Sequence, residues 1–150
     1  GGIPEGLRDK LLKAYRTLSA FPEVPGVLNE LKNAGAKLAI LTNGDRDMID
    51  DAVASAGLVG VFDEIITVHE AGTYKPNAVV YQLALDRFGV RREDIAFQSS
   101  NRWDIAGAKA FGFTCTWINR LGLPDEYPDF PADRVFDDLR PLLQLIRNAS

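Results

Sequence analysis

The densest group of chemically useful side chains in the sequence is Ser99-Ser100-Asn101-Arg102-Trp103-Asp104, which follows a short apolar run. Two hydroxyls, an amide and a carboxylate at the end of a strand could orient a water molecule and assist its attack on a substrate. A simpler interpretation is helix capping, because Asn101 or Asp104 could start a helix that is expected near Ile105. Trp103 fits either the core or the wall of a small apolar pocket.

Two further polar clusters follow other apolar runs. Thr42-Asn43-Gly44 comes directly after residues 38–41, and its hydroxyl, amide and backbone N–H groups could bind an anion, although the same residues suit a helix cap and turn. Lys75 precedes Pro76, so its backbone is extended and its ammonium could point over the end of a sheet, unless it is a solvated surface lysine. Tyr81 lies farther along the next helix, where a tyrosine belongs to the core more often than it binds a ligand.

Alternating helix and strand patterns must position these clusters. The apolar periodicity predicts helices at about 4–19, 27–35, 46–56, 77–88, 105–111 and 139–147, and strands at 37–41, 64–68, 95–98, 113–118 and 134–136. Short, nearly continuous apolar strands between helices are typical of a parallel sheet covered on both faces. We therefore predict an α/β fold with an open, doubly wound, Rossmann-like sheet, which binds ligands beyond the carboxyl ends of its strands.

Composition excludes several other classes of protein. The chain has 150 residues, 46% of them hydrophobic, and 17 Lys+Arg against 21 Asp+Glu, so its formal net charge is −4. These values are typical of one soluble globular domain, and without a basic block we expect no nucleic-acid partner. No apolar stretch approaches the roughly 18 residues of a membrane span, and no signal segment opens the chain. One cysteine makes no internal disulfide, so a cytoplasmic location is the default expectation.

His69 and Cys115 are the single histidine and the single cysteine. They cannot together supply a structural zinc site, so chemistry must come mainly from carboxylates, hydroxyls, amides and lysine. His69 is expected to be a structural or surface residue, and Cys115 a buried small hydrophobe. Arg102 could touch a substrate or be solvated, and Asn119 could close a pocket or cap a turn.

The order and spacing of the polar clusters resemble the second, third and fourth motifs of the haloacid dehalogenase superfamily. The matching segments are Leu41-Thr42-Asn43-Gly44, Tyr74-Lys75-Pro76 and residues 97–112. The Ser-Ser-Asn-x-x-Asp form of the fourth motif, with Trp117-Ile118-Asn119-Arg120 downstream, is similar to that of the type II L-2-haloacid dehalogenases. The resemblance covers about residues 4–146.

The resemblance implies hydrolytic dehalogenation of short (S)-2-haloalkanoic acids to (R)-2-hydroxyalkanoic acids through an aspartyl ester, without a metal or other cofactor. The implied ligands are the 2-haloacid and the halide ion. Thr42 and Asn43 would bind the substrate carboxylate or help to hold the halide. Lys75 would keep the nucleophilic carboxylate ionised and oriented, because a nearby cation favours the charged form.

The fourth motif supplies the other implied site residues. Ser99, Asn101 and Asp104 would fix the nucleophile and the lysine and would position the hydrolytic water. Tyr81 and Trp103 would line the substrate pocket. Homodimers are common among such relatives, so a homodimer stays open for this chain.

A magnesium-dependent phosphatase of the same superfamily is the alternative enzyme. Those phosphatases resemble Gly-Asp-x-x-x-Asp at the fourth motif, where two acids help to hold the ion. Here Ser99-Ser100 stands over the Gly-Asp pair and leaves only Asp104. Since Mg²⁺ requires carboxylate charge and halide needs no metal to leave, the substitution favours the metal-free reaction.

The family's first motif, an apolar strand ending in Asp-x-x-Gly-Thr, has no counterpart in these residues. The resemblance implies that residues 1–19 form the last helix of a helical cap and residues 20–150 a Rossmann-like core without its first strand. We expect the chain to be the carboxyl-terminal part of a longer enzyme, inactive without the nucleophilic Asp. A missing central strand would leave backbone groups unpaired, so another segment or chain must fill the gap. A non-catalytic binding module is the remaining alternative.

Overall fold

The computed structural model describes residue 14 and residues 18–147, which form alternating helices and strands. The α-helices are α2 (Val24–Asn33), α3 (Arg46–Ser55), α4 (Ala78–Phe88), α5 (Arg102–Phe111) and α6 (Leu142–Arg147), and the 3₁₀ helices are η1 (Val68–Glu70) and η2 (Arg92–Asp94). The strands are β1 (Ala39–Thr42), β2 (Glu64–Thr67), β3 (Ala96–Ser99), β4 (Thr114–Ile118) and β5 (Arg134–Phe136). This order confirms the predicted α/β class.

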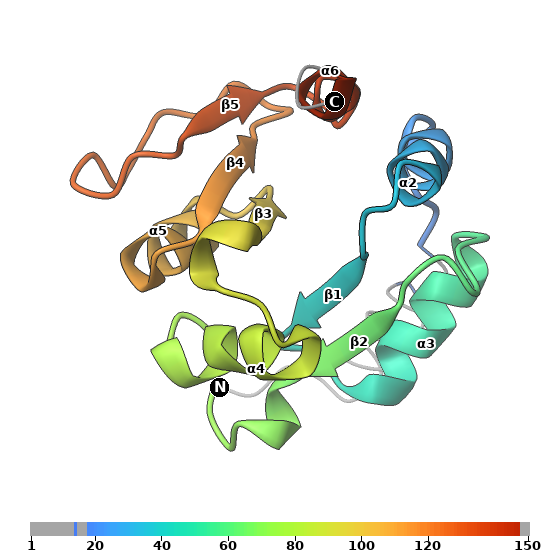
Figure 1. Ribbon diagram of the computed structural model, residues 1–150, viewed down its shortest axis with the longest axis horizontal. Helices are drawn as coiled ribbons and strands as arrows, with labels where there is room; N and C mark the ends of the chain where they lie inside the picture. Colours follow the sequence, from blue (N-terminus) through green and yellow to red (C-terminus); the bar gives the residue numbers. More distant parts are fainter. Residues whose placement is uncertain (1–13, 15–17, 148–150) are drawn as a thin grey trace.

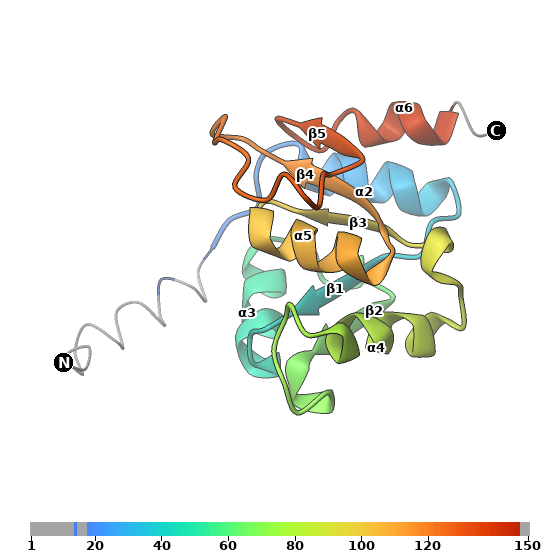
Figure 2. The same ribbon diagram turned by 90° about the vertical axis from the view of Figure 1, so that its left-hand side faces the viewer.

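The strands pair in parallel, as the apolar runs predict. β1 pairs with β2, and β3, β4 and β5 form a second sheet in that order. Helices α4 and α5 lie on one side of the strands and α2 and α3 on the other (Figures 1 and 2). None of the described helices is long and apolar enough to span a bilayer.

The facing edges of the two sheets are unusual for a parallel fold. In Figure 1, β1 is the strand of its sheet that lies nearer to β3, but within the described residues neither strand has a second ladder partner. Both strands carry apolar residues yet are incompletely buried, whereas every residue of β4 after Thr114 is buried. Parallel strands are normally buried on both faces. Strands β1 and β3 have the apolar composition of such buried strands, but the described residues bury them only in part.

The helix ends follow local capping chemistry. Asn77 precedes α4, and its Oδ1 accepts a hydrogen bond from the backbone N–H of Val79 at 3.0 Å. Gly89 ends the helix in the left-handed conformation, at φ +63°. Lys75 and Pro76 therefore lie immediately before a well-defined helix start, which orients the lysine side chain toward the strand ends.

Three predicted helix boundaries were wrong. Helix α2 begins at Val24 instead of residue 27, because a proline is tolerated in the first turn of a helix, where its missing N–H needs no helical partner. Helix α5 begins at Arg102 instead of residue 105, because the Asn101 carbonyl accepts the N–H groups of both Asp104 and Ile105. Helix α6 begins at Leu142 instead of residue 139, after a turn with i to i+3 bonds in which Pro141 has no N–H to donate. The predicted helix at 4–19, interpreted as the last helix of a cap, lies almost entirely outside the described residues.

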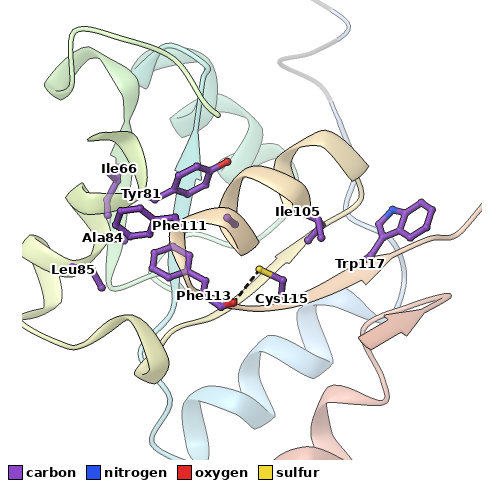
Figure 3. Packing of buried hydrophobic residues seen from close by; sticks show 10 residues of the cluster. Ile66, Tyr81, Ala84, Leu85, Ile105, Phe111, Phe113, Cys115 and Trp117 are labelled. Carbon is purple, nitrogen blue, oxygen red and sulfur yellow. Dashed lines mark hydrogen bonds between the residues drawn. The ribbon is translucent and has the colours of Figure 1, made fainter. Parts of the chain in front are cut away.

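An aromatic core joins α4, α5, β3 and β4. Tyr81 contacts the rings of Phe97, Phe111 and Phe113 with centroid separations of 5.8–5.9 Å. Figure 3 shows Tyr81 with Phe111 and Phe113 in this core. Gly107 permits the close approach of α4 and α5, because a Cβ there would lie 2.6 Å from the Tyr81 hydroxyl and 2.5 Å from Pro76 Cβ. This packing brings the Tyr81 hydroxyl to the first turn of α5.

Candidate active site

Lys75 and Asp104 form a buried ion pair where the carboxyl ends of β1, β2 and β3 converge. The Lys75 Nζ lies 2.7 Å from Asp104 Oδ2 and donates to the carbonyl oxygen of Leu41 at 3.0 Å. The side chains are 8% and 3% exposed. A pair so deeply buried requires further hydrogen bonds to offset the cost of desolvation.

Ser99 and Tyr81 supply those further hydrogen bonds. The Ser99 hydroxyl donates to Asp104 Oδ2 at 3.1 Å, and the Tyr81 hydroxyl donates to Oδ1 at 3.0 Å. Burial, followed by the negative charge of Asp104, raises the pKa of Tyr81 well above its usual range, so the phenol stays protonated and remains a donor. Both carboxylate oxygens of Asp104 are therefore engaged by groups of this chain.

Asn43 joins the loop after β1 to the backbone of Lys75. Its Oδ1 accepts the Lys75 N–H at 2.9 Å, and its Nδ2 lies 3.5 Å from the Lys75 carbonyl oxygen. The strong contact fixes the oxygen end of the amide, so the nitrogen end is the one left to donate elsewhere. Thr42 lies beside it, where its Oγ1 accepts the Gly44 N–H at 3.0 Å. The structure thus brings the second and third polar clusters together.

The cluster at residues 99–104 contributes both buried and exposed groups. Asn101 is exposed and occupies the N-cap position of α5, but its side chain makes no capping hydrogen bond; its backbone N–H donates to Ser99 Oγ at 3.1 Å. Asp104 lies inside the helix, so the capping interpretation of its carboxylate was wrong. The Trp103 side chain is partly exposed, and its ring centroid lies 5.9 Å from Lys75 Nζ.

Tyr81 does not occupy the position expected of a residue that lines a pocket. It is 0% exposed and belongs to the aromatic core, so within the described residues it reaches the site only through its hydroxyl bond to Asp104. Periodicity placed it on the inward face of the helix, but only the α4–α5 contact at Gly107 determines where the hydroxyl ends.

Arg102 was missed as an organising residue. It is 6% exposed and therefore not solvated, and its guanidinium pairs with Asp125. Sequence reasoning had no signal for this contact, because Asp125 lies 23 residues away in a proline-rich loop. Leu41 was missed as well, because its contribution is a backbone carbonyl.

The remaining singled-out residues have structural positions. His69 is an exposed residue whose Nε2 lies 2.7 Å from Asp45 Oδ1. Cys115 is buried, which raises the pKa of its thiol to about 12, as expected of a small core residue. Asn119 caps a turn through reciprocal side-chain bonds to the backbone of Leu123. Across the described residues, no three His, Cys, Asp or Glu side chains are grouped to hold a metal ion.

The chain is similar in sequence and fold to known proteins. The chain is 44% identical over 140 residues to (S)-2-haloacid dehalogenase 1 of Pseudomonas sp. (strain CBS-3), covering 93% of this chain and 62% of that protein. A solved L-2-haloacid dehalogenase has a TM-score of 0.90 at 42% identity, with 97% of this chain and 64% of that one covered.

A third relative was solved with a bound molecule. It is the L-2-haloacid dehalogenase of Xanthobacter autotrophicus with chloropropionic acid covalently bound, at a TM-score of 0.84 and 31% identity, covering all of this chain and 70% of that one. The chain thus spans about three fifths of the length of the curated relative. Residues 6–112 match the model of the haloacid dehalogenase-like hydrolases. The chain therefore belongs to the haloacid dehalogenase-like hydrolase family.

Proposed function

We propose that the full-length protein containing this chain dehalogenates short (S)-2-haloalkanoic acids hydrolytically, giving (R)-2-hydroxyalkanoic acids and halide ions. The observation that carries this proposal is the buried Lys75 ammonium at the strand ends. Two of its three N–H groups are used by Leu41 and Asp104, which leaves one for a nucleophilic carboxylate. Asp104 is unsuited to be that nucleophile, because both of its oxygens already accept hydrogen bonds.

The nucleophile in this proposal is an aspartate on a strand between β1 and β3. The unpaired facing edges of these strands and their incomplete burial support the position, since buried backbone groups require partners. The greater length of the relatives also supports an additional segment. Residues 20–150 are then the core domain that this segment completes, and without it the 150-residue chain is expected to be inactive.

The reaction proceeds in two displacements. A carboxylate oxygen of the aspartate attacks C2 of the substrate, and the carbon–halogen bond breaks as the halide leaves with the bonding electrons, which inverts C2. Water then attacks the carbonyl carbon of the aspartyl ester and breaks the bond between that carbon and the bridging oxygen, which came from the aspartate and leaves as the hydroxyl of the product. The aspartate is regenerated with an oxygen atom from water, one proton of which goes to the product hydroxyl while the other is released. The covalently bound chloropropionic acid in one relative is consistent with such an ester.

The described residues divide between binding and positioning in this mechanism. In the proposal, Thr42 and the nitrogen end of the Asn43 amide would donate to the substrate carboxylate or to the departing halide. The bonds that Thr42 Oγ1 accepts from Gly44 and Asn43 Oδ1 accepts from Lys75 leave the donor groups of both side chains for this role. The Ser99 hydroxyl shares Asp104 Oδ2 with the Lys75 ammonium, and the Asn101 N–H donates to Ser99 Oγ. In the proposal, Ser99 and Asn101 would orient the hydrolytic water. Trp103 would form the apolar side of the pocket.

Tyr81 has a revised part in the proposal. It holds Asp104 in place from the core rather than contacting the substrate, because the tyrosine is fully buried and its hydroxyl donates to the carboxylate. Asp104 in turn holds the Lys75 ammonium, so the tyrosine would act on the reaction through two other residues.

The metal-dependent phosphatase reaction fits the site less well. Asp104 already accepts three hydrogen bonds from this chain, which leaves its carboxylate little capacity to hold Mg²⁺. The adjacent Ser99 and Ser100 are hydroxyls, which bring no charge to compensate a divalent ion.

The test measures halide release from each enantiomer of 2-chloropropionate in the presence of a chelator. The gene product from its natural start is compared with the 150-residue chain. Release from the S enantiomer alone, by the longer protein alone, is the expected result. No release by either protein, together with magnesium-dependent hydrolysis of a phosphate ester, would sink the dehalogenase proposal in favour of the phosphatase.

A further inference from the structure

We propose that Arg102 is a positioning residue of this site, which holds residues 121–131, here called the 121–131 loop, against the start of α5 and thereby fixes one wall beside Trp103. The inference rests on the proposed function, because that wall matters to catalysis only if Trp103 contacts a substrate. It adds a residue that the motif comparison does not assign.

The guanidinium of Arg102 binds the loop through four contacts. Its Nε and Nη2 lie 2.6 and 3.1 Å from the two carboxylate oxygens of Asp125. Nη2 also lies 2.7 Å from the carbonyl oxygen of Tyr127 and 2.8 Å from that of Phe130. The planar guanidinium suits this arrangement, because it presents several N–H donors in a fixed geometry that lysine lacks.

Because the Arg102 guanidinium is buried, it requires the acceptors that the loop provides. The Arg102 side chain is 5% exposed, and its guanidinium lies 5.6 Å from the ring centroids of both Trp117 and Tyr127. Its Nη1 is buried without a hydrogen-bond partner among the described residues. A guanidinium removed from water is costly unless it is paired, so its position depends on the acceptors that the loop provides.

The 121–131 loop in turn depends on Arg102. Every residue of the loop is exposed. Its other hydrogen bonds are local, namely those of Leu123 and Gly122 with Asn119 and those inside the loop that involve the N–H groups of Tyr127 and Phe130. Within the described part of the chain, all hydrogen bonds between this loop and α5 come from Arg102. One side chain therefore anchors the whole loop to the helix.

The anchored loop forms a wall of the groove at Trp103. Tyr127 and Phe130 from the loop, Trp103 and Ala106 from α5, and Pro76 beside Lys75 all line a groove of about 570 Å³. Trp103 also faces the Lys75 ammonium. Releasing the loop should therefore loosen the fit of substrate at Trp103 and leave the Lys75–Asp104 pair, and with it the chemical step, unchanged.

The test compares Asp125→Ala with Asp129→Ala in the gene product from its natural start. Asp129 is an exposed acidic residue of the same loop, and no hydrogen bond or ion pair is described for it, so its variant is a matched control. In Asp125→Ala we expect amide hydrogen exchange in the loop to accelerate about tenfold or more. Iodide should quench the fluorescence of Trp103 more strongly, and the Trp103 signal is assigned by comparison with Trp103→Phe. The KM for 2-chloropropionate should rise about fivefold while kcat stays unchanged.

Each readout can overturn the proposal separately. Unchanged exchange in Asp125→Ala would show that Arg102 does not anchor the loop. Faster exchange with unchanged quenching and KM would show an anchor that does not act on the site. Arg102→Lys keeps the positive charge but loses the several N–H donors of the planar guanidinium. It should reproduce the faster hydrogen exchange and the higher KM of Asp125→Ala. If the parent protein released no halide, the proposed function would fail, and exchange with quenching would still decide for or against the anchor.

Discussion

Two buried cations on either side of the first turn of α5 differ in where their carboxylate partners lie. The Lys75–Asp104 pair is buried on both sides, with side chains 8% and 3% exposed. The Arg102–Asp125 pair joins a 5% exposed arginine to a 42% exposed aspartate. The first pair links packed elements of the core, whereas the second links the core to an exposed loop. Both contacts are ion pairs, so their position in the fold must account for their different roles. The core pair Lys75–Asp104 supports the proposed reaction, whereas the Arg102–Asp125 pair orders the loop that forms one wall of the groove.

The energetic consequences should differ in the same way. Removing one partner of a fully buried pair leaves an uncompensated charge that water cannot reach. Removing Asp125 also leaves a buried guanidinium, but the exposed loop can move and admit water. We expect global destabilisation in the first case and local loosening in the second.

Lys75→Met should have the largest effect, because it leaves Asp104 buried without its cation. The free energy of unfolding should fall by about 3–5 kcal/mol and halide release should be lost. Urea denaturation and the halide assay measure the two effects. Lys109→Met is the control, since Lys109 pairs with Asp133 at 31% and 32% exposure and should lose less than about 1 kcal/mol. Equal losses in both variants would contradict the comparison.

Tyr81→Phe should have the next largest effect, because it removes the donor to Asp104 Oδ1 while it keeps the aromatic packing. Leaving a buried acceptor unsatisfied should lower the free energy of unfolding by about 1–3 kcal/mol. We expect kcat to fall more than KM rises, because the tyrosine holds the positioning carboxylate and does not touch the substrate. A change in KM alone would show instead that Tyr81 lines the pocket.

The hydrogen-exchange rate of the 121–131 loop should depend on pH through the Arg102–Asp125 pair. The hydrogen bond from Arg102, followed by that from the Tyr127 N–H, lowers the pKa of Asp125 below its usual 3.8. A carboxylate with a lowered pKa in the folded state contributes stability above the unfolded pKa and loses it as the pH falls through the folded value. Hydrogen exchange in the 121–131 loop should therefore accelerate below pH 3.8, relative to its own intrinsic rate, in the parent protein and not in Asp125→Asn.

His69→Gln should have the smallest effect. His69 and Asp45 are each 67% exposed, so their contact is screened by water although the two atoms lie 2.7 Å apart. We expect a change of less than about 1 kcal/mol in the free energy of unfolding, measured by thermal melting at pH 7. A loss of about 2 kcal/mol or more would show that the exposure of an ion pair does not predict its contribution to the free energy of unfolding.

Much of the fold and the site was predictable because it depends on local pattern. The apolar runs that became β1 to β5 and the helix ends at Ala34-Gly35 and Gly89 follow from periodicity and backbone preference. The clusters at Thr42-Asn43, Lys75 and Ser99 to Asp104 come together because parallel strands present their carboxyl ends at one edge.

The errors came from contacts that join distant segments. The start of α5 was predicted too late, since nothing in the pattern showed that the Asn101 carbonyl would begin the helix. The side chain of Arg102 was expected to touch a substrate or to be solvated, but it is buried and paired with Asp125 of the 121–131 loop. The family resemblance implied that Tyr81 lines the pocket, whereas the helix pattern favoured the core, and the close packing at Gly107 leaves the ring without exposure.

The sequence by itself determined the element types, the parallel arrangement and the set of polar residues at the strand ends, because these depend on hydrophobic period and on the chemistry of turns and caps. Only the tertiary structure decided which polar groups are paired: the saturation of Asp104, the direction of the Asn43 amide and the anchoring of the 121–131 loop by Arg102. Whether two groups pair depends on differences of a few tenths of an ångström in the distance between segments that are far apart in the chain. No local sequence pattern encodes those differences.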